Sequence, residues 1–249
     1  KRLDAALALR REVAGLGKDG PLTPSPSPSG GEGSTSAYRV VNSEGDGLGG
    51  LIVDRYGEYL CLQIGTAGMD RRLDALLDLL EERFHPKGIL DKSDARARQS
   101  EGLEMRGKHA LRGETPKDLI EVREDGLPIL CDLREGAGQK TGLYLDQREN
   151  RRRCAQFAQG RDVLDVFCYS GAFSLHAFRA GARSLTLADS SEAALALAKT
   201  NFERNQIDDA DLVCARWPEA LRLLAEQKRS FGLVVLDPPK FARARHAIE

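Results

Sequence analysis

Two kinds of hydrophobic pattern divide this chain near residue 135. Over residues 37–134, short apolar runs of strand length are broken by Gly, and one amphipathic helix carries leucines at spacings of three and four within residues 69–84. Arg55-Tyr56-Gly57-Glu58 and Asp125-Gly126 are typical of the tight turns of two hairpins. We therefore expect a small α+β domain over residues 37–134.

From residue 135 onward, apolar strands alternate with helical patterns. The expected strands are DVLDVF, SLTLAD, DLVCA and FGLVVLDPP, and the expected helices are AFSLHAFRAG, EAALALAKTNFERN and PEALRLLAEQ. This alternation indicates a parallel sheet covered on both faces, with its ligand at the carboxyl ends of the strands. We expect a partial Rossmann-like α/β domain over residues 135–249, truncated after its fourth strand.

The first 36 residues predict little folded structure. Residues 1–18 begin with a weak helical pattern, interpreted as a helical remnant, and residues 19–36 form a linker rich in Pro, Ser and Gly. The chain contains no apolar run of membrane-spanning length and begins without a secretory signal, which predicts a cytoplasmic location.

Composition narrows the function classes. The net charge of -1 gives no overall attraction to nucleic acid, so RNA contacts must come from local patches. Five scattered cysteines without a CxxC pair argue against disulfides and against a structural zinc site, so we expect reduced thiols and no metal.

The first expected strand of the second domain ends in residues 165–171, DVFCYSG. Gly171 lets the backbone approach a ligand closely, and the helix after it begins with free amide donors. This segment fits a cofactor, although an ordinary strand-to-helix turn with a buried Asp165 stays an alternative.

Asp189 lies at the matching end of the next expected strand, where an acid can accept both ribose hydroxyls of an adenosine cofactor. No GxGxxG follows the first strand, so a cradle for a pyrophosphate is missing, which favours S-adenosylmethionine (SAM) over a dinucleotide. The alternative role is a helix N-cap, which Asp189 or Ser190 could provide for residues 192–205.

The fourth expected strand delivers Asp237, Pro238, Pro239 and Lys240 to the same edge. Prolines fix the backbone and remove amide donors, so they hold a polar side chain in one orientation beside a flat base. In register with the two earlier acids, this turn is the most specific local signal in the chain.

Together these segments resemble the class I methyltransferases of large-subunit ribosomal RNA that make 5-methylcytosine. That family combines a PUA domain, a small α+β middle domain and a Rossmann-like SAM domain. The resemblance covers residues 37–249 and rests on residues 140–151 (KTGLYLDQRENR), residues 165–171, Asp189 and residues 237–241 (DPPKF).

The resemblance implies SAM as cofactor and large-subunit ribosomal RNA as partner, with no metal and no membrane, and it leaves a homodimer open. The cofactor-binding residues that it implies are Gln147, Arg148, Asp165, Phe167, Tyr169, Ser170, Gly171, Asp189 and Asp237. The catalytic residues that it implies are Asp237, Pro238 and Lys240.

The implied chemistry needs a cysteine thiolate that adds to carbon-6 of cytosine, so that carbon-5 can take the methyl group before its proton and the thiolate leave. Asp237 would hold the base near its ring nitrogen and amine. The family's nucleophilic cysteine belongs to a motif beyond the fourth strand, and Cys168 is interpreted as a packing residue. We expect little or no methyl transfer by this chain alone.

Three departures from the family pattern leave alternatives open. The PUA domain is missing, residues 19–36 look like an insertion, and the third strand is followed by Cys214-Ala215-Arg216-Trp217-Pro218 where relatives have acids before an aromatic. A methyltransferase acting on a guanine nitrogen, or a non-enzymatic RNA-binding protein that kept the SAM fold, are the competing hypotheses.

A basic segment precedes the first strand of the second domain. Tyr144 is followed by Arg148, Arg151, Arg152 and Arg153, a combination that allows stacking and phosphate contacts with RNA. The alternative for Arg152 and Arg153 is the solvated start of a helix.

Overall fold

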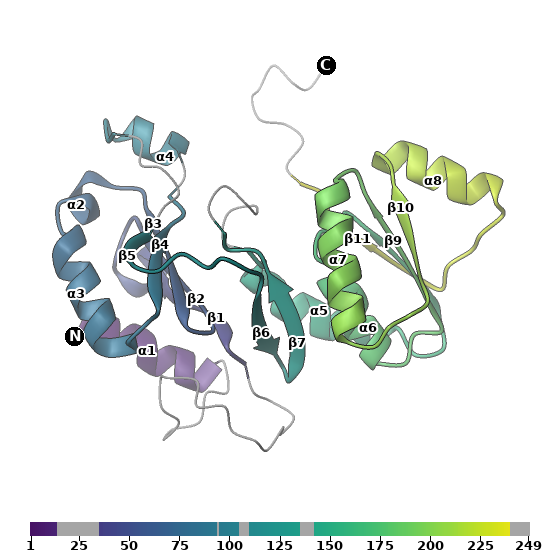
Figure 1. Ribbon diagram of the computed structural model, residues 1–249, viewed down its shortest axis with the longest axis horizontal. Coiled ribbons are helices and arrows are strands. Elements are labelled where there is room, and N and C mark those ends of the chain that lie inside the picture. The colour runs from purple at the N-terminus through teal and green to yellow at the C-terminus, as the bar shows by residue number, and fades with distance from the viewer. Residues whose placement is uncertain (14–34, 94, 105–109, 135–141, 240–249) are drawn as a thin grey trace. The chain divides into compact units, whose positions relative to one another are not determined.

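The computed structural model describes residues 1–13, 35–93, 95–104, 110–134 and 142–239. It forms two compact units, Lys1–Leu145 and Asp146–Glu249 (Figure 1). Most of the expected linker lies outside the described residues. Its last two residues, Thr35 and Ser36, are described, and the Ser36 amide donates a 2.8 Å hydrogen bond to the Arg123 carbonyl.

The first unit is built on a five-stranded sheet with the spatial order β1-β2-β3-β4-β5. Its pairs are antiparallel except β3 and β4, which run parallel because two helices cross over between them. The strands are β1 Ala37–Asn42, β2 Leu51–Tyr56, β3 Tyr59–Ile64, β4 Gly88–Asp91 and β5 Ala110–Gly113, and the crossover helices are α2 Ala67–Asp70 and α3 Leu73–Phe84.

The remaining elements of this unit flank the sheet. They are helix α1 Arg2–Val13, the short 3-10 helix η1 Ser43–Asp46, helix α4 Ala95–Ser100, and the hairpin strands β6 Ile120–Glu124 and β7 Leu127–Cys131. Neither α4 nor β5 was expected from the sequence, which there reads as a polar stretch.

Both predicted hairpins are present. In the second, Asp125 and Gly126 both have positive φ angles of 54° and 80°, as the turn of a two-residue hairpin requires. The first turn is shorter than expected, because Arg55 and Tyr56 still belong to β2 and only Gly57 and Glu58 connect the strands.

The predicted apolar stripe of α3 is confirmed. Leu77, Leu80 and Phe84 are each 2% exposed and pack in one cluster with core residues of β1 to β4, whereas the charged residues of α3 remain outside. Burial of this stripe stabilises the helix against the sheet.

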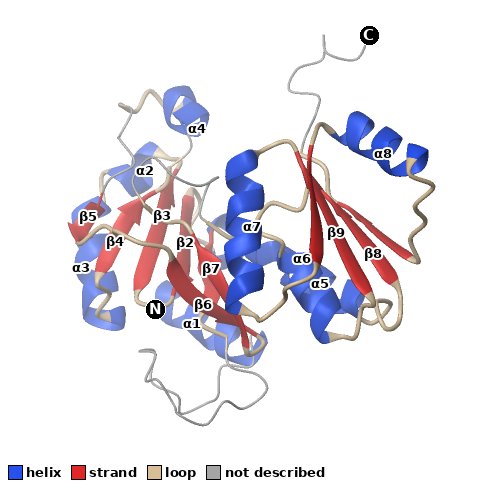
Figure 2. Cartoon of the chain, turned by 45° about the vertical axis from the view of Figure 1, so that its right-hand side comes forward, coloured by secondary structure: helices blue, strands red, loops and turns tan. Residues whose placement is uncertain are grey.

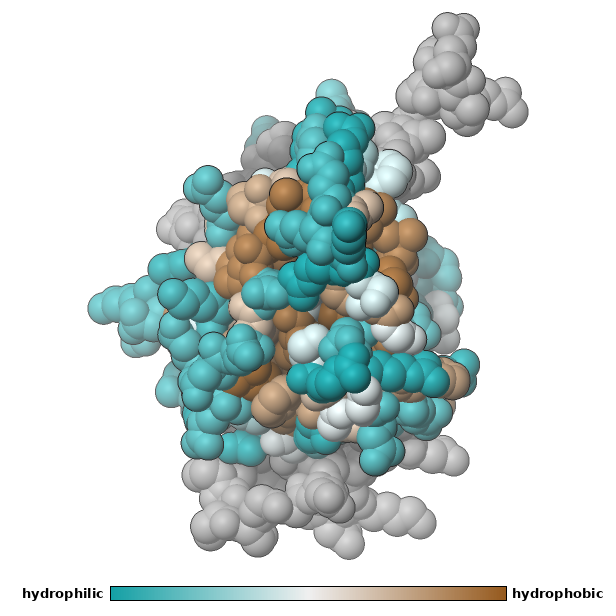
Figure 3. Space-filling model, turned by 90° about the vertical axis from the view of Figure 1, so that its right-hand side faces the viewer, coloured by the Kyte–Doolittle hydropathy of each residue, from teal (hydrophilic) through white to brown (hydrophobic). Residues whose placement is uncertain are grey.

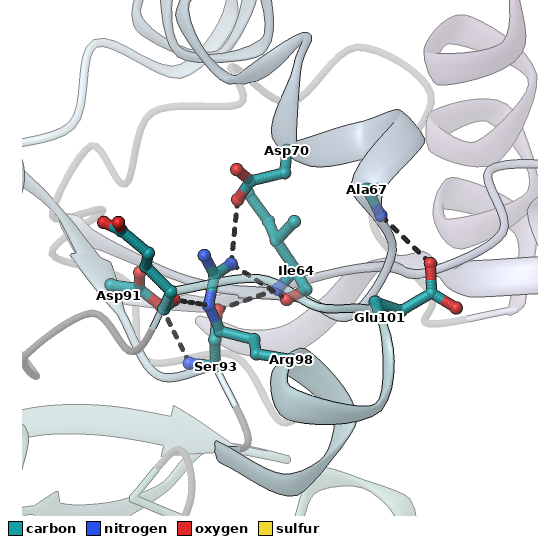
Figure 4. Close-up of polar contacts among 8 residues, drawn as sticks. Ile64, Ala67, Asp70, Asp91, Ser93, Arg98 and Glu101 are labelled. Carbon is teal, nitrogen blue, oxygen red and sulfur yellow. Dashed lines mark hydrogen bonds and ion pairs between the residues drawn. The ribbon is translucent and has the colours of Figure 1, made fainter.

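A buried arginine ties together the loops at one end of this sheet. Arg98 of α4 donates 2.8 Å from Nη1 to Asp70, and its Nε donates 2.9 Å to the Glu104 carbonyl (Figure 4). Nη1 also lies 3.4 Å from the Ile64 carbonyl at the end of β3. Beside it, Oδ1 of the buried Asp91 accepts a 2.8 Å hydrogen bond from the Ser93 amide. Arg98 therefore joins the end of β3, α2 and the segment after α4 through buried polar contacts.

The second unit contains a four-stranded sheet with the order β10-β9-β8-β11, in which every pair is parallel. The strands are β8 Asp162–Val166, β9 Ser184–Asp189, β10 Ala210–Cys214 and β11 Leu233–Leu236. The 3-10 helix η2 Leu145–Gln147 spans the boundary between the units, and the helices of the second unit are α5 Arg148–Ala155, α6 Ala172–Arg179, α7 Glu192–Arg204 and α8 Trp217–Glu226. The predicted alternation of strands and helices is confirmed.

Helices cover both faces of this sheet (Figure 2). On one face, Leu187 lies under Phe202 and Ala198 of α7. On the other, Leu164 and Val166 form a cluster with Leu224 of α8.

Strand β11 keeps apolar side chains at the surface. Val234 and Leu236 are 52% and 60% exposed and pair in register with Leu164 and Val166, so they lie on the α8 face of the sheet. Figure 3, which looks onto the side of this unit that carries the strands and α8, shows an apolar surface there between hydrophilic regions. No helix in the described part of the chain is long and apolar enough to cross a bilayer.

Candidate functional site

The strand register brings three acids to one edge of the second unit's sheet. Val166 of β8 pairs with Ala188 of β9 and with Leu236 of β11. Asp189 and Asp237 each follow directly on one of those partners, and Asp165 precedes Val166 by one residue. All three carboxylates therefore lie at the carboxyl ends of adjacent parallel strands, where ligands of such sheets bind.

Asp165 is the buried member of this group, with 2% of its surface exposed. Its Oδ2 accepts a 2.8 Å hydrogen bond from the Ser174 hydroxyl of α6. Burial raises the pKa of Asp165 to about 7, and the charges of Asp189 and Asp237 add to this rise, while the bond from Ser174 opposes it. Asp165 is thus close enough to Asp189 and Asp237 to be affected by their charges.

Asp189 is partly exposed and has a fixed orientation. Its Oδ2 accepts a 3.1 Å hydrogen bond from the Tyr169 amide, and its Oδ1 accepts a 2.9 Å bond from the Ser191 amide. The predicted alternative role as N-cap is wrong for both Asp189 and Ser190. The cap is Ser191, whose hydroxyl accepts a hydrogen bond from the Ala194 amide at 3.2 Å.

The loop between β8 and α6 has an unusual backbone. Phe167, Tyr169 and Gly171 have φ angles of 65°, 48° and 74°, so the left-handed conformation recurs at every second residue. Such a conformation is rare for aromatic residues and marks functional loops. Ser170 is buried, and its carbonyl accepts a 3.1 Å hydrogen bond from the side chain of Asn201 in α7.

Gly171 is required for close packing as well as for its backbone conformation. A Cβ at this position would lie 3.2 Å from both Leu187 and Phe202 and 3.3 Å from Ala198. The residue caps α6, which begins at Ala172. The backbone at Gly171 therefore approaches the core of the protein closely, and its close approach to a ligand stays a prediction.

Asp237 is at the surface, directly after β11. Its pKa is raised by partial desolvation and by the charge of Asp146, whereas the charge of Arg151 lowers it. Pro238 beside it is also exposed, and the predicted catalytic Lys240 lies outside the described residues. Residues 140 and 141 of the 140–151 motif lie outside them too.

Residues 145–151 of this motif form η2 and the start of α5. The Gln147 side chain accepts a 2.6 Å hydrogen bond from Asn150, and Arg148 is half-buried. The charge of Asp146 in this segment raises the pKa of Asp237. That Gln147 and Arg148 border the cofactor stays a prediction.

The predicted phosphate contact by Arg151 is not supported, because the side chain is only 2% exposed. Its guanidinium lies 5.9 Å from the centroid of the Phe173 ring in α6. Arg152 and Arg153 do reach the surface, where both pair with Glu149 at 3.8 Å and 3.2 Å. The sequence offers no signal for this difference, since the run RENRRR contains arginines on every face of the helix.

All five cysteines are free, and those near the acids are poor nucleophiles. Burial raises the pKa of Cys168, and the charges of Asp165 and Asp189 raise it further. Burial and Asp165 also raise the pKa of Cys154. Because the thiolate is the reactive form, the interpretation of Cys168 as a packing residue agrees with the structure.

The residues at this edge fit an adenosyl cofactor. Each carboxylate oxygen of Asp189 accepts one amide and keeps a second lone pair for a ribose hydroxyl. The adjacent loop is held in place by the Asn201 side chain and by the packing around Gly171.

The chain matches the family of S-adenosylmethionine-dependent methyltransferases over residues 105–248. One curated relative is the ribosomal RNA large subunit methyltransferase I of Photobacterium profundum, 36% identical over 247 residues that cover 98% of this chain and 57% of the relative. That of Shewanella amazonensis is 39% identical over 214 residues, covering 85% of this chain and 53% of the relative. The chain thus spans little more than half the length of these relatives.

Solved structures share the fold. A protein from Streptococcus mutans described as a SAM-dependent methyltransferase has a TM-score of 0.74 at 22% identity, covering 98% of this chain and 61% of its own. The SAM-dependent methyltransferase from Agrobacterium tumefaciens has a TM-score of 0.61 at 19% identity, covering 87% and 64%. The predicted Rossmann-like methyltransferase fold is confirmed, and the sequence match shows that this chain belongs to the family of S-adenosylmethionine-dependent methyltransferases.

Proposed function

We propose that this chain binds SAM at the carboxyl ends of β8, β9 and β11 and serves in the methylation of large-subunit ribosomal RNA, at carbon-5 of a cytosine. The observation that carries this proposal is the convergence of Asp165, Asp189 and Asp237 on one strand edge. The relatives named ribosomal RNA large subunit methyltransferase I support the choice of substrate.

In this proposal, residues 135–249 form the SAM domain and residues 37–134 the middle domain. SAM supplies an activated methyl group. Asp189 accepts the ribose hydroxyls, the loop from Phe167 through Tyr169, Ser170 and Gly171 encloses the cofactor with Gln147 and Arg148 at its border, and Asp165 lies beneath. A homodimer stays a prediction.

The target base would lie at the outer end of β11. Asp237 is exposed there and can accept a hydrogen bond from the amine of a cytosine, while Pro238 fixes the turn and Lys240 follows it. Holding the base in one orientation aligns it for in-line methyl transfer.

Calorimetric titration with S-adenosylhomocysteine tests the cofactor site. Wild type should bind S-adenosylhomocysteine. Asp189→Asn should weaken binding by at least about tenfold, since ~1.4 kcal/mol per lost interaction corresponds to that factor. Asp208→Asn should leave binding unchanged. Asp208 is a suitable control because it is an exposed acid before the opposite end of β10. Absence of binding by folded wild-type protein would overturn the proposal.

Because we expect little or no methyl transfer by this chain alone, the substrate is tested with a form of the protein that also carries the family's cysteine motif. Unmodified large-subunit ribosomal RNA is incubated with SAM and this form, and its nucleosides are analysed. Detection of 5-methylcytosine supports the proposal, whereas a methylated guanine would show that the target base is a guanine. RNA binding that is indifferent to S-adenosylhomocysteine and to Asp189→Asn would favour a binding protein without catalysis.

A further inference from the structure

Helices α5 and α6 end side by side, at the edge of the sheet opposite to the three acids. The two helices pack along each other (Figure 2), and β8 and β9 begin a few residues after them. Two backbone hydrogen bonds join the turns that follow the helices. The Gly160 amide donates a 2.7 Å bond to the Gly181 carbonyl, and the Arg183 amide donates a 2.8 Å bond to the carbonyl of residue 161. The ends of α5 and α6 therefore form one continuous surface.

This surface carries exposed arginines and exposed phenylalanines. Its members, which we call the arginine–phenylalanine surface, are Arg153, Phe157, Arg161, Phe178, Arg179 and Arg183. Arg153 pairs with Glu149 at 3.2 Å, and Arg183 pairs with Asp162. The remaining acid of residues 148–184 is Asp165, which is buried at the other edge of the sheet. The arginines therefore outnumber the acids beside them, so this surface is positively charged although the whole chain has a net charge of -1.

The two phenylalanines of this surface are open to solvent. Phe157 is 58% exposed in the turn after α5, and Phe178 is 43% exposed near the end of α6. Arginines are favoured at the ends of helices by the helix dipole, but an exposed phenylalanine gains nothing from that dipole. Aromatic rings beside arginines are typical of surfaces that bind single-stranded nucleic acid, because bases stack on the rings while guanidinium groups contact phosphates.

We propose that the arginine–phenylalanine surface binds a single-stranded segment of RNA, with Phe157 and Phe178 stacking on bases and the arginines contacting phosphates. The inference rests on the proposed function for the choice of RNA as the nucleic acid. Strand β8 has five residues, so this surface lies roughly 17 Å from the edge with the three acids, at ~3.3 Å per residue. It therefore holds the RNA chain at a distance from the target base and does not touch the reacting atoms.

Fluorescence anisotropy of a labelled single-stranded oligoribonucleotide, measured over a series of salt concentrations, tests this inference. Wild type should bind the RNA, and its affinity should fall as the salt concentration rises. Phe157→Ala should weaken binding about tenfold, which is the typical effect of losing one stacked base. Arg153→Gln should reduce the slope of log affinity against log salt concentration by about 0.7, the contribution of one phosphate contact on a single strand.

Two variants on α8 are matched controls. Arg222 and Leu223 are exposed there, and α8 covers the other face of the sheet. Arg222→Gln and Leu223→Ala should therefore leave both the affinity and its salt dependence unchanged. Glu149→Gln should raise the affinity, because it removes a carboxylate that competes with phosphate for Arg153. The inference is overturned if folded wild type binds no RNA, or if Phe157→Ala and Arg153→Gln bind it as wild type does.

Hydrogen exchange of the wild-type protein gives a second measurement that needs no variant. The amides of residues 156–161 and 178–183 should exchange more slowly when the oligoribonucleotide is present, and protection confined to other segments would overturn the inference. Neither measurement uses SAM. Failure to bind S-adenosylhomocysteine would therefore reject the proposed cofactor site alone, whereas RNA binding that is indifferent to Phe157 and Arg153 would reject this surface alone.

Discussion

The hydroxyl of Ser174 donates a 2.8 Å hydrogen bond to Oδ2 of Asp165, and both side chains are buried between β8 and α6. Burial raises the pKa of Asp165 more strongly than this bond and a hydrogen bond from the Ser174 backbone lower it. The pKa of Asp165 rises to about 7.

The free energy of unfolding should therefore decrease as the pH rises, because of Asp165. Between pH 4 and 7 the unfolded chain has lost the Asp165 proton while the folded chain retains it, so the free energy of unfolding decreases over that window and levels off above it. The full effect is on the order of 4 kcal/mol for a rise of ~3 pH units. Asp165→Asn should lack this fall in urea unfolding measured from pH 4 to 8, and parallel curves for both proteins would contradict the assignment.

Gly171→Ala should destabilise the second unit by about 2 to 3 kcal/mol, since the new Cβ meets three core side chains in a left-handed backbone. Gly160→Ala is the matched control, because Gly160 has a φ of 67° and nothing within 4 Å of the added carbon, so only the cost of the backbone conformation of about 1 kcal/mol applies. The single tryptophan, Trp217, lies in this unit and reports its unfolding by fluorescence. Equal losses in the two variants would show that the packing around Gly171 is loose.

Arg98→Met should loosen the end of the first unit's sheet, because it leaves Asp70 and the Glu104 carbonyl without their buried donor. We expect the free energy of local opening to decrease by about 2 to 4 kcal/mol. Hydrogen exchange of the β3 and α4 amides measures it in this unit, which has no tryptophan. The control is Arg72→Met, since the exposed Arg72 donates only to the Gly68 carbonyl of its own turn. Unchanged exchange in Arg98→Met would show that the cluster contributes nothing to stability.

The sequence reveals those features of the fold that follow from repeated patterns. Apolar strands alternating with helices predicted the parallel sheet, and Asp125-Gly126 predicted a hairpin with positive φ angles. The three acids at the strand edge followed from the same reasoning, because parallel strands expose their carboxyl ends together.

Features that depend on which polar residue is buried could not be predicted. Helix α4 has no apolar stripe and is anchored by Arg98, so its sequence reads as surface. The burial of Arg151 and Ser174 could not be predicted for the same reason. Neither residue type indicates burial, and only the tertiary packing supplies the partner. The cap at Ser191 was missed by one residue, which is the usual uncertainty of a helix start.

The alternating left-handed residues of the loop at 167–171 bear on how the protein could be improved. Phe167 and Tyr169 are aromatic residues in a backbone conformation that glycine adopts without strain. Each of them lowers the folding stability by on the order of 1 kcal/mol. A variant with glycine at Phe167 would melt at a higher temperature only if the relief of strain exceeded the extra freedom gained by the unfolded chain. Because an aromatic residue has fewer backbone conformations than glycine, the unfolded chain loses less entropy when this loop forms.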